Sequence, residues 1–190
     1  MATIPVSRKK FLWLDMEMTG LDERTEVILE VAAVVTDFGL RAVDQYQAVV
    51  KQPQAILDSM NDWCKKTHGA SGLTHLVETQ GKDLALVEED LMAIIERNFA
   101  RNARVVLAGN SIWNDRRFVE KYLPQFAKRL HYRMVDVSSF KEVYRERYGL
   151  KVEKKSAHRA IDDINESIHE LQTYLSWIVP RSVNPLGAED

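Results

Sequence analysis

Hydrophobic positions follow strand-like patterns near the start of the chain. Residues 11–14 (FLWL) form a short apolar run that ends at Asp15, and residues 29–38 (LEVAAVVTDF) are apolar and rich in β-branched side chains. Residues 43–50 (VDQYQAVV) mix apolar and polar side chains in near alternation after a short loop. Runs of this kind are typical of β-strands. We therefore expect three strands in close succession.

From Gln54 onward the apolar positions recur at helical spacing, with a first break at residues 70–72. The clearest helix is expected over residues 83–99, where apolar side chains recur every three or four positions. The remaining pattern predicts strands at 104–108 and 133–135, helices at 112–122, 125–130 and 137–147, a basic loop at 151–156, and a long last helix that the segment His158–Asp163 opens.

Three strands followed by helix–strand–helix–strand–helix predict an α/β fold with a mixed five-stranded sheet flanked by helices. Hairpin-linked strands would be antiparallel, and strands joined through helices would be parallel. This is the ribonuclease H-like order, although other α/β folds share it. For 190 residues we expect a single domain over residues 11–178, a flexible N-terminus over 1–10 and a loose tail over 179–190.

Composition narrows the function classes. Lys and Arg number 26 against 28 Asp and Glu, a net charge of −2, whereas proteins that grip long nucleic acid usually carry a basic excess. The single cysteine, Cys64, excludes an intramolecular disulfide and favours a reducing compartment. The chain has no run long enough to span a membrane, and its start resembles neither a secretory signal nor a mitochondrial presequence. We expect a cytoplasmic protein; a mitochondrial form would need a presequence.

Acidic residues follow two of the expected strands. Asp15 and Glu17 lie at positions i and i+2, so their carboxylates point to the same side, and a divalent cation between them would relieve their repulsion. Asp115 follows another strand and a turn, at the start of a helix. Taken singly, the first pair also fits a solvated strand end, and Asp115 also fits a helix-terminal acid. A lone His158 likewise fits an ordinary surface residue.

Together these segments resemble the DEDDh 3′–5′ exonucleases, whose motifs follow the order D-x-E, Asp, H-x-A-x-x-D. Five blocks resemble the oligoribonuclease family within that group, and they are residues 13–22 (WLDMEMTGLD), 60–73 (MNDWCKKTHGASGL), 109–118 (GNSIWNDRRF), 131–138 (HYRMVDVS) and 158–167 (HRAIDDINES). The resemblance runs from about residue 11 to residue 178. Residues 62–68 (DWCKKTH) look more like the eukaryotic members than the bacterial ones.

The resemblance implies a role for each matching residue. Asp15, Glu17, Asp115 and Asp163 would hold two divalent cations, Mg²⁺ or Mn²⁺, and His158 would be the general base. Asp162 competes with Asp163 as the last acid, although the H-x-A-x-x-D spacing favours Asp163. The implied substrate is a very short oligoribonucleotide, down to a dinucleotide, which is cut from its 3′ end into 5′-mononucleotides.

The family's substrate contacts also have counterparts here. Leu21 would wedge against bases, Trp63 would stack on one, and His68 would line the site. Trp63 also fits half-buried packing, and Leu21 also fits ordinary loop surface.

Ser111, Tyr132 and Arg133 would contact the phosphate on the 5′ side of the short substrate. In the family the Tyr and Arg come from the other subunit, so the resemblance implies a homodimer. The rival functions are a DEDDh exonuclease of longer DNA or RNA, and an inactive fold kept as a binding module. The blocks around Trp63 and Tyr132 and the lack of basic excess count against the first, and the complete set of acids counts against the second.

Overall fold

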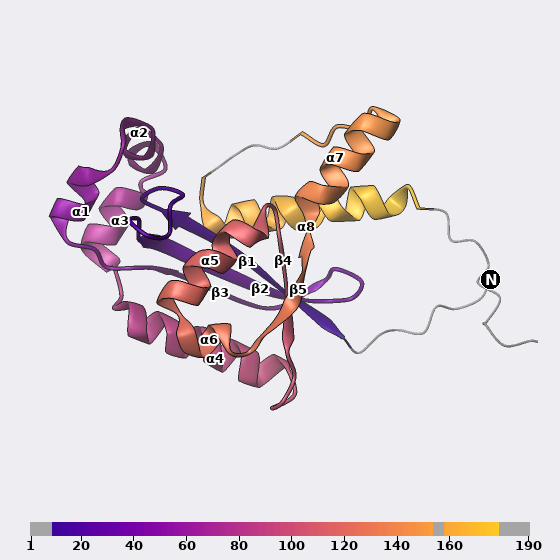
Figure 1. Ribbon diagram of the computed structural model, residues 1–190, viewed down its shortest axis with the longest axis horizontal. Coiled ribbons are helices and arrows are strands. Elements are labelled where there is room, and N and C mark those ends of the chain that lie inside the picture. The colour runs from indigo at the N-terminus through magenta and orange to yellow at the C-terminus, as the bar shows by residue number, and fades with distance from the viewer. Residues whose placement is uncertain (1–8, 154–157, 179–190) are drawn as a thin grey trace, which may run out of the picture.

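The computed structural model describes residues 9–153 and 158–178 of the chain. One sheet of five strands lies at its centre, in the order β3-β2-β1-β4-β5 (Figure 1). Its strands are β1 (Lys10–Met18), β2 (Ile28–Asp37), β3 (Ala42–Val49), β4 (Val105–Gly109) and β5 (Leu130–Asp136). The pairs β1–β2 and β2–β3 are antiparallel, while β1–β4 and β4–β5 are parallel. The predicted mixed sheet flanked by helices is thus confirmed.

The helices cover both faces of this sheet and one of its ends. They are α1 (Gln54–Ser59), α2 (Asp62–Ala70), α3 (Leu73–Gln80), α4 (Leu84–Asn98), α5 (Ile112–Tyr122), α6 (Pro124–Ala127), α7 (Val137–Tyr148) and α8 (Ala160–Ser176). In Figure 1, α8 lies across one face of the sheet, and α4, α5 and α6 lie toward the viewer on the other. Among the described residues, we find no helix with the length and apolar character that a membrane crossing requires.

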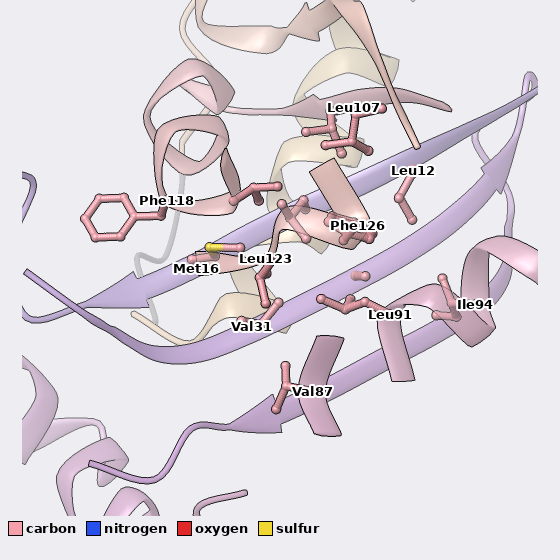
Figure 2. Close-up of a cluster of buried hydrophobic side chains, with 14 of the residues drawn as sticks. Leu12, Met16, Val31, Val87, Leu91, Ile94, Leu107, Phe118, Leu123 and Phe126 are labelled. Atoms are coloured by element: carbon pink, nitrogen blue, oxygen red, sulfur yellow. The ribbon is translucent and has the colours of Figure 1, made fainter. Parts of the chain in front are cut away.

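Side chains of β1 alternate between two buried cores. Leu12 and Met16 belong to the core beneath α4, α5 and α6, together with Val31 of β2 (Figure 2). Trp13 points the other way and packs in the core beneath α8. Because side chains alternate along a strand, Asp15 and Glu17 continue the row that Trp13 begins, on the face that α8 covers. The sequence therefore aims these two acids at the last helix.

Three element boundaries differ from the predictions by three residues or more, and the helix predicted from Gln54 is divided at residues 60–61 into α1 and α2. β1 continues through Asp15 and Glu17 to Met18, so the acids lie inside the strand and not after it. The predicted helix 125–130 is wrong beyond Ala127, because Leu130 pairs with Val105 and begins β5. β1 extends because its alternate positions remain buried where Asp15 and Glu17 interrupt the apolar run, whereas β5 extends because Leu130 pairs with Val105.

The last helix also begins later than predicted. His158 precedes α8 with a left-handed backbone (φ 51°), and Arg159 caps the helix, so the segment leads into α8 and does not form its first turn. The predicted loop 151–156 has no regular structure over residues 151–153. The rest of that loop, the tail 179–190 and residues 1–8 of the N-terminus lie outside the described residues, while Lys10 is already part of β1.

Candidate active site

Three carboxylates meet where β1 passes the start of α8. One oxygen each from Asp15, Glu17 and Asp163 lies within 4.8 Å of the others. β1 supplies the first two from one face, and the first turn of α8 supplies the third. Asp162 is exposed and is not part of this group. The geometry thus selects Asp163 over Asp162 as the acid that faces the strand.

Asp115 reaches the same strand from α5. Its carboxylate is buried, and its Oδ1 accepts a hydrogen bond from the backbone N of Met16 at 3.0 Å. β4 ends at Gly109, so the Asp115 side chain takes the place of a strand partner beside β1. A Cβ on Gly109 would lie 2.9 Å from the carbonyl oxygen of Leu14, and glycine therefore permits this close approach.

Burial and mutual repulsion dominate the electrostatics of these acids. Burial raises the pKa of Asp15 well above its usual range, and the charges of Asp115, Asp163 and Glu17 raise it further. Burial followed by repulsion from Asp163 raises the pKa of Glu17 to about 7. Burial also raises the pKa of Asp115, against the hydrogen bond from Met16. Carboxyls crowded in this way are stabilised as anions by a divalent cation.

Two histidines approach the acids in different settings. His158 is partly exposed, and its ring meets the Trp63 ring edge-on, with the centroids 5.8 Å apart. His68 is buried, its Nε2 lies 2.9 Å from the carbonyl oxygen of Met18, and its Nδ1 lies 3.8 Å from Oε2 of Glu17. A carbonyl only accepts, so Nε2 carries the hydrogen. Burial lowers the pKa of His68, which therefore stays neutral beside Glu17 near pH 7.

A cavity of about 390 Å³ opens beside Glu17. Its walls include Leu21, Trp63 and His68, and the side chains of Leu21 and Trp63 are 69% and 62% exposed. Leu21 is held from α5, because Nη2 of Arg117 donates to its carbonyl oxygen at 3.0 Å. Exposed apolar side chains can pack against the flat rings of a ligand, and the neighbouring acids can bind its phosphates through cations. The cavity therefore fits a ligand that has both rings and phosphates.

Ser111 lies at the start of α5 in a left-handed conformation (φ 48°). Its backbone N donates to Oδ1 of Asp136 and to Oγ of Ser138, each at 2.9 Å. These bonds fix the turn between β4 and α5, which also directs Asp115 toward β1. The positioning roles of Asp136 and Ser138 could not be read from their sequence positions alone.

Tyr132 and Arg133 are not brought to the acidic group within one chain. Both are exposed on β5, the edge strand, and the Arg133 guanidinium lies 5.3 Å from the centre of the Tyr132 ring. Met134 aligns with Leu107, which aligns with Leu12. With strands about 4.8 Å apart and a rise of about 3.3 Å per residue, the Cα atoms of Tyr132 and Arg133 lie about 16–19 Å from that of Asp15.

Sequence reasoning missed a buried ion pair behind the site. Glu30 of β2 is fully buried, and Nη2 of Arg159 donates to its Oε1 at 2.7 Å. The available signal was the charge itself, since an acid inside an otherwise apolar strand must find a partner when buried.

The fold and the acidic group can now be compared with known proteins. The model of the RNase T exonuclease family matches residues 12–171. Human mitochondrial oligoribonuclease is 41% identical over 181 residues, which cover 93% of this chain and 76% of that protein. The chain belongs to the oligoribonuclease family of exonucleases. The oligoribonuclease of Francisella tularensis is also 41% identical, over 88% of this chain and 95% of its own.

Solved structures show the same fold at much lower identity. Escherichia coli exonuclease I in complex with a 5cy-dT13 oligonucleotide superposes with a TM-score of 0.69 at 12% identity, over 90% of this chain and 41% of that chain. This chain thus spans about two fifths of exonuclease I, and the likeness shows the ribonuclease H-like fold alone. Membership in the oligoribonuclease family makes the chain a metal-dependent 3′–5′ exoribonuclease, with the acidic group as the candidate divalent-metal site.

Proposed function

We propose that the chain removes mononucleotides from the 3′ end of very short oligoribonucleotides, including dinucleotides. The observation that carries this proposal is the acidic group beside a cavity walled by Leu21 and Trp63. Acids supply a place for phosphodiester hydrolysis, while the apolar walls can stack on any base. Such a site needs no long basic track, in agreement with the net charge of −2.

We further propose that Asp15, Glu17, Asp115 and Asp163 hold two divalent cations, Mg²⁺ or Mn²⁺. The donor set fits, because hard cations prefer carboxylate oxygens and three of these oxygens lie within 4.8 Å of one another. The pKa values of Asp15 and Glu17 are raised because burial and neighbouring acids disfavour their anionic forms, and a bound cation would stabilise those anions. Bound cations would activate the attacking water and neutralise charge on the leaving oxygen.

The side chains of the chain would then position the reactants. His158 would take the proton of the attacking water, because its ring is accessible next to the base-stacking residue Trp63. Neutral His68 would support Glu17 without titrating near pH 7. The expected phenotype of His158→Ala is loss of turnover with Mn²⁺ and substrate binding intact, and near-normal turnover would refute the general-base role.

A homodimer would complete the site. Tyr132 and Arg133 stand exposed on an edge strand, away from the acids of their own chain, so a second copy could receive them. Arg133 together with Ser111 would hold the phosphate on the 5′ side of a short substrate. The proposed setting is the cytoplasm, where thiols such as Cys64 stay reduced.

Mixing two variants that are each impaired on a dinucleotide tests both the activity and the dimer. A 5′-labelled diribonucleotide and a twenty-mer are incubated with Arg133→Ala, with Asp115→Asn, and with the two after joint unfolding and refolding. If Arg133 acts across subunits, half of the dimers are mixed and each restores one complete site, so about a quarter of the wild-type dinucleotide rate returns. No recovery in mixed dimers would refute the contribution in trans. Wild-type cleavage of the twenty-mer but not the dinucleotide would refute the substrate proposal.

A further inference from the structure

We propose that Glu30 is a positioning residue for His158. It holds His158 in place by binding the side chain of Arg159 and the backbone N of Ala160, the two residues that follow His158. This inference rests on the proposed role of His158 as the general base. Glu30 lies near the start of β2, the strand next to β1, and neither the D-x-E motif nor the H-x-A-x-x-D motif includes it.

The Glu30 carboxylate clamps the start of α8. Its Oε1 accepts from Nη2 of Arg159 at 2.7 Å, and its Oε2 accepts from the backbone N of Ala160 at 3.0 Å. Nε of Arg159 lies 3.2 Å from both oxygens, so the pair is bidentate. Nε2 of Gln47 on β3 donates to Oε1 at 2.8 Å and fixes the carboxylate from the other side. The planar fork of Arg159 and the backbone bond together allow one orientation of this segment.

The residue before the clamp has a backbone conformation that needs such support. His158 has φ 51°, and a non-glycine residue keeps the left-handed conformation only where its surroundings determine it. Residues on its C-terminal side, Arg159 and Ala160, are the two that Glu30 binds. The clamp thus determines where the His158 ring stands relative to the strand.

The same carboxylate lies beside the acidic group. Glu30 on β2 is the register partner of Glu17 on β1, and directly paired residues project from the same face of a sheet. Glu30 therefore fixes the orientation of His158 relative to β1, the strand that carries Asp15 and Glu17. Stability alone does not account for this arrangement, because a buried ion pair is seldom more stabilising than apolar side chains of the same volume.

The experiment compares Glu30→Gln with Asp44→Asn. Asp44 is also a strand carboxylate that binds an arginine, Arg97 of α4, but it pairs with Val35 at the opposite end of the sheet. Steady-state turnover of a diribonucleotide gives kcat and KM, and calorimetry gives Mn²⁺ binding. We expect Glu30→Gln to lower kcat about 100-fold, the effect of a displacement near 1 Å, with KM within about twofold of wild type and Mn²⁺ affinity lowered far less than kcat. Asp44→Asn should leave all three unchanged.

A double-mutant cycle separates positioning from a general loss of structure. If Glu30 acts through His158, then adding Glu30→Gln to His158→Ala should not lower the residual rate further. Arg159→Lys, which keeps the charge but not the fork, should lose kcat to an intermediate extent and covers the case in which Glu30→Gln does not fold. Unchanged kcat in both Glu30→Gln and Arg159→Lys overturns the inference, as does a further loss of rate in the double mutant. An active His158→Ala would instead overturn the proposed general base.

Discussion

The acidic group on β1 and the exposed pair on β5 belong to one sheet, yet the fold supports them in opposite ways. Asp15 and Glu17 lie in the middle strand, where β2, α8 and the Asp115 side chain surround them. Tyr132 and Arg133 lie on an edge strand, and their side chains face water. The first region is organised by the core of one chain, whereas Tyr132 and Arg133 lie outside both sheet cores of the described residues.

This difference separates two tasks of one enzyme. Metal binding requires crowded like charges, and only a rigid core can hold them against their repulsion. Measuring the length of a substrate requires a contact at a set distance from the acids, and an exposed edge offers such a contact to a second copy. If substitutions in both regions changed the turnover of short and long substrates in the same way, this division of tasks would be wrong.

The largest effect is expected at the core. Asp115→Asn keeps an oxygen that can accept from the Met16 backbone but loses a charge, so turnover should fall about 10³-fold, as several kcal/mol of transition-state stabilisation imply. The rate is measured with Mn²⁺ on a diribonucleotide. Glu120→Gln, which removes an exposed carboxylate of the same helix, is the control and should stay within about twofold. Equal losses in the two variants would argue against the metal site.

The edge should matter for short substrates alone. Arg133→Ala should lower dinucleotide turnover between about 10- and 100-fold, because one charge-assisted hydrogen bond is worth ~1.5–3 kcal/mol, and should affect a twenty-mer far less. Arg104→Ala is the matched control, since Arg104 and Arg133 line the same cavity of about 520 Å³ at the other end of the sheet. A uniform loss across substrate lengths would remove the length-measuring role from Arg133.

A smaller effect is expected on the stability of the metal-free protein, which the repulsion between the crowded carboxylates lowers. The pKa of Glu17 is about 7 in the folded, metal-free protein and 4.5 for an ordinary glutamate, so the folded state binds the proton more tightly. The free energy of unfolding in a chelator should therefore fall as pH rises from about 4.5 to about 7. Glu17→Gln should remove this part of the slope and stabilise the metal-free protein at pH 8 by on the order of 3 kcal/mol.

Denaturant unfolding at a series of pH values measures this slope. Adding Mn²⁺ at pH 8 should stabilise the wild type and have much less effect on Glu17→Gln. Matching slopes for the two proteins would show that Glu17 carries no such penalty.

The smallest effect is the salt dependence of binding. Dinucleotide affinity, measured on the inactive Asp115→Asn variant, should show a log–log slope against salt no steeper than about −3, because a dinucleotide offers few phosphates. Adding Arg133→Ala should make the slope shallower by about one, and adding Trp63→Ala should weaken binding without changing the slope. A steep slope that survives Arg133→Ala would place the electrostatic contact elsewhere.

Much of the fold and of the acidic group could be predicted because local patterns carry them. A continuous apolar and β-branched run locates β2, near-alternating apolar positions locate β3, and the D-x-E spacing places Asp15 and Glu17 on one face. Spacing likewise favoured Asp163, which does face the strand.

Features that depend on distant partners could not be predicted. The Glu30–Arg159 pair joins residues 129 positions apart, and neither residue alone identifies the other. The H-x-A-x-x-D motif suggests that the last helix starts at His158, but the backbone of His158 is left-handed and the helix starts after it. The first residues of β5 carry no strong strand pattern in the sequence. They belong to the strand because Leu130 pairs with Val105, a residue far away in the chain.

The central position of β1 also determines how long the site lasts. Amide hydrogens of a middle strand exchange with solvent chiefly when the whole domain unfolds, whereas those at an edge exchange through local opening. Because Asp15 and Glu17 share their strand with Leu12 and Trp13, fluctuations that release β5 leave the acids together. Deuterium uptake at Met16 should therefore report global unfolding, and Asp15 and Glu17 should stay side by side for as long as the chain is folded.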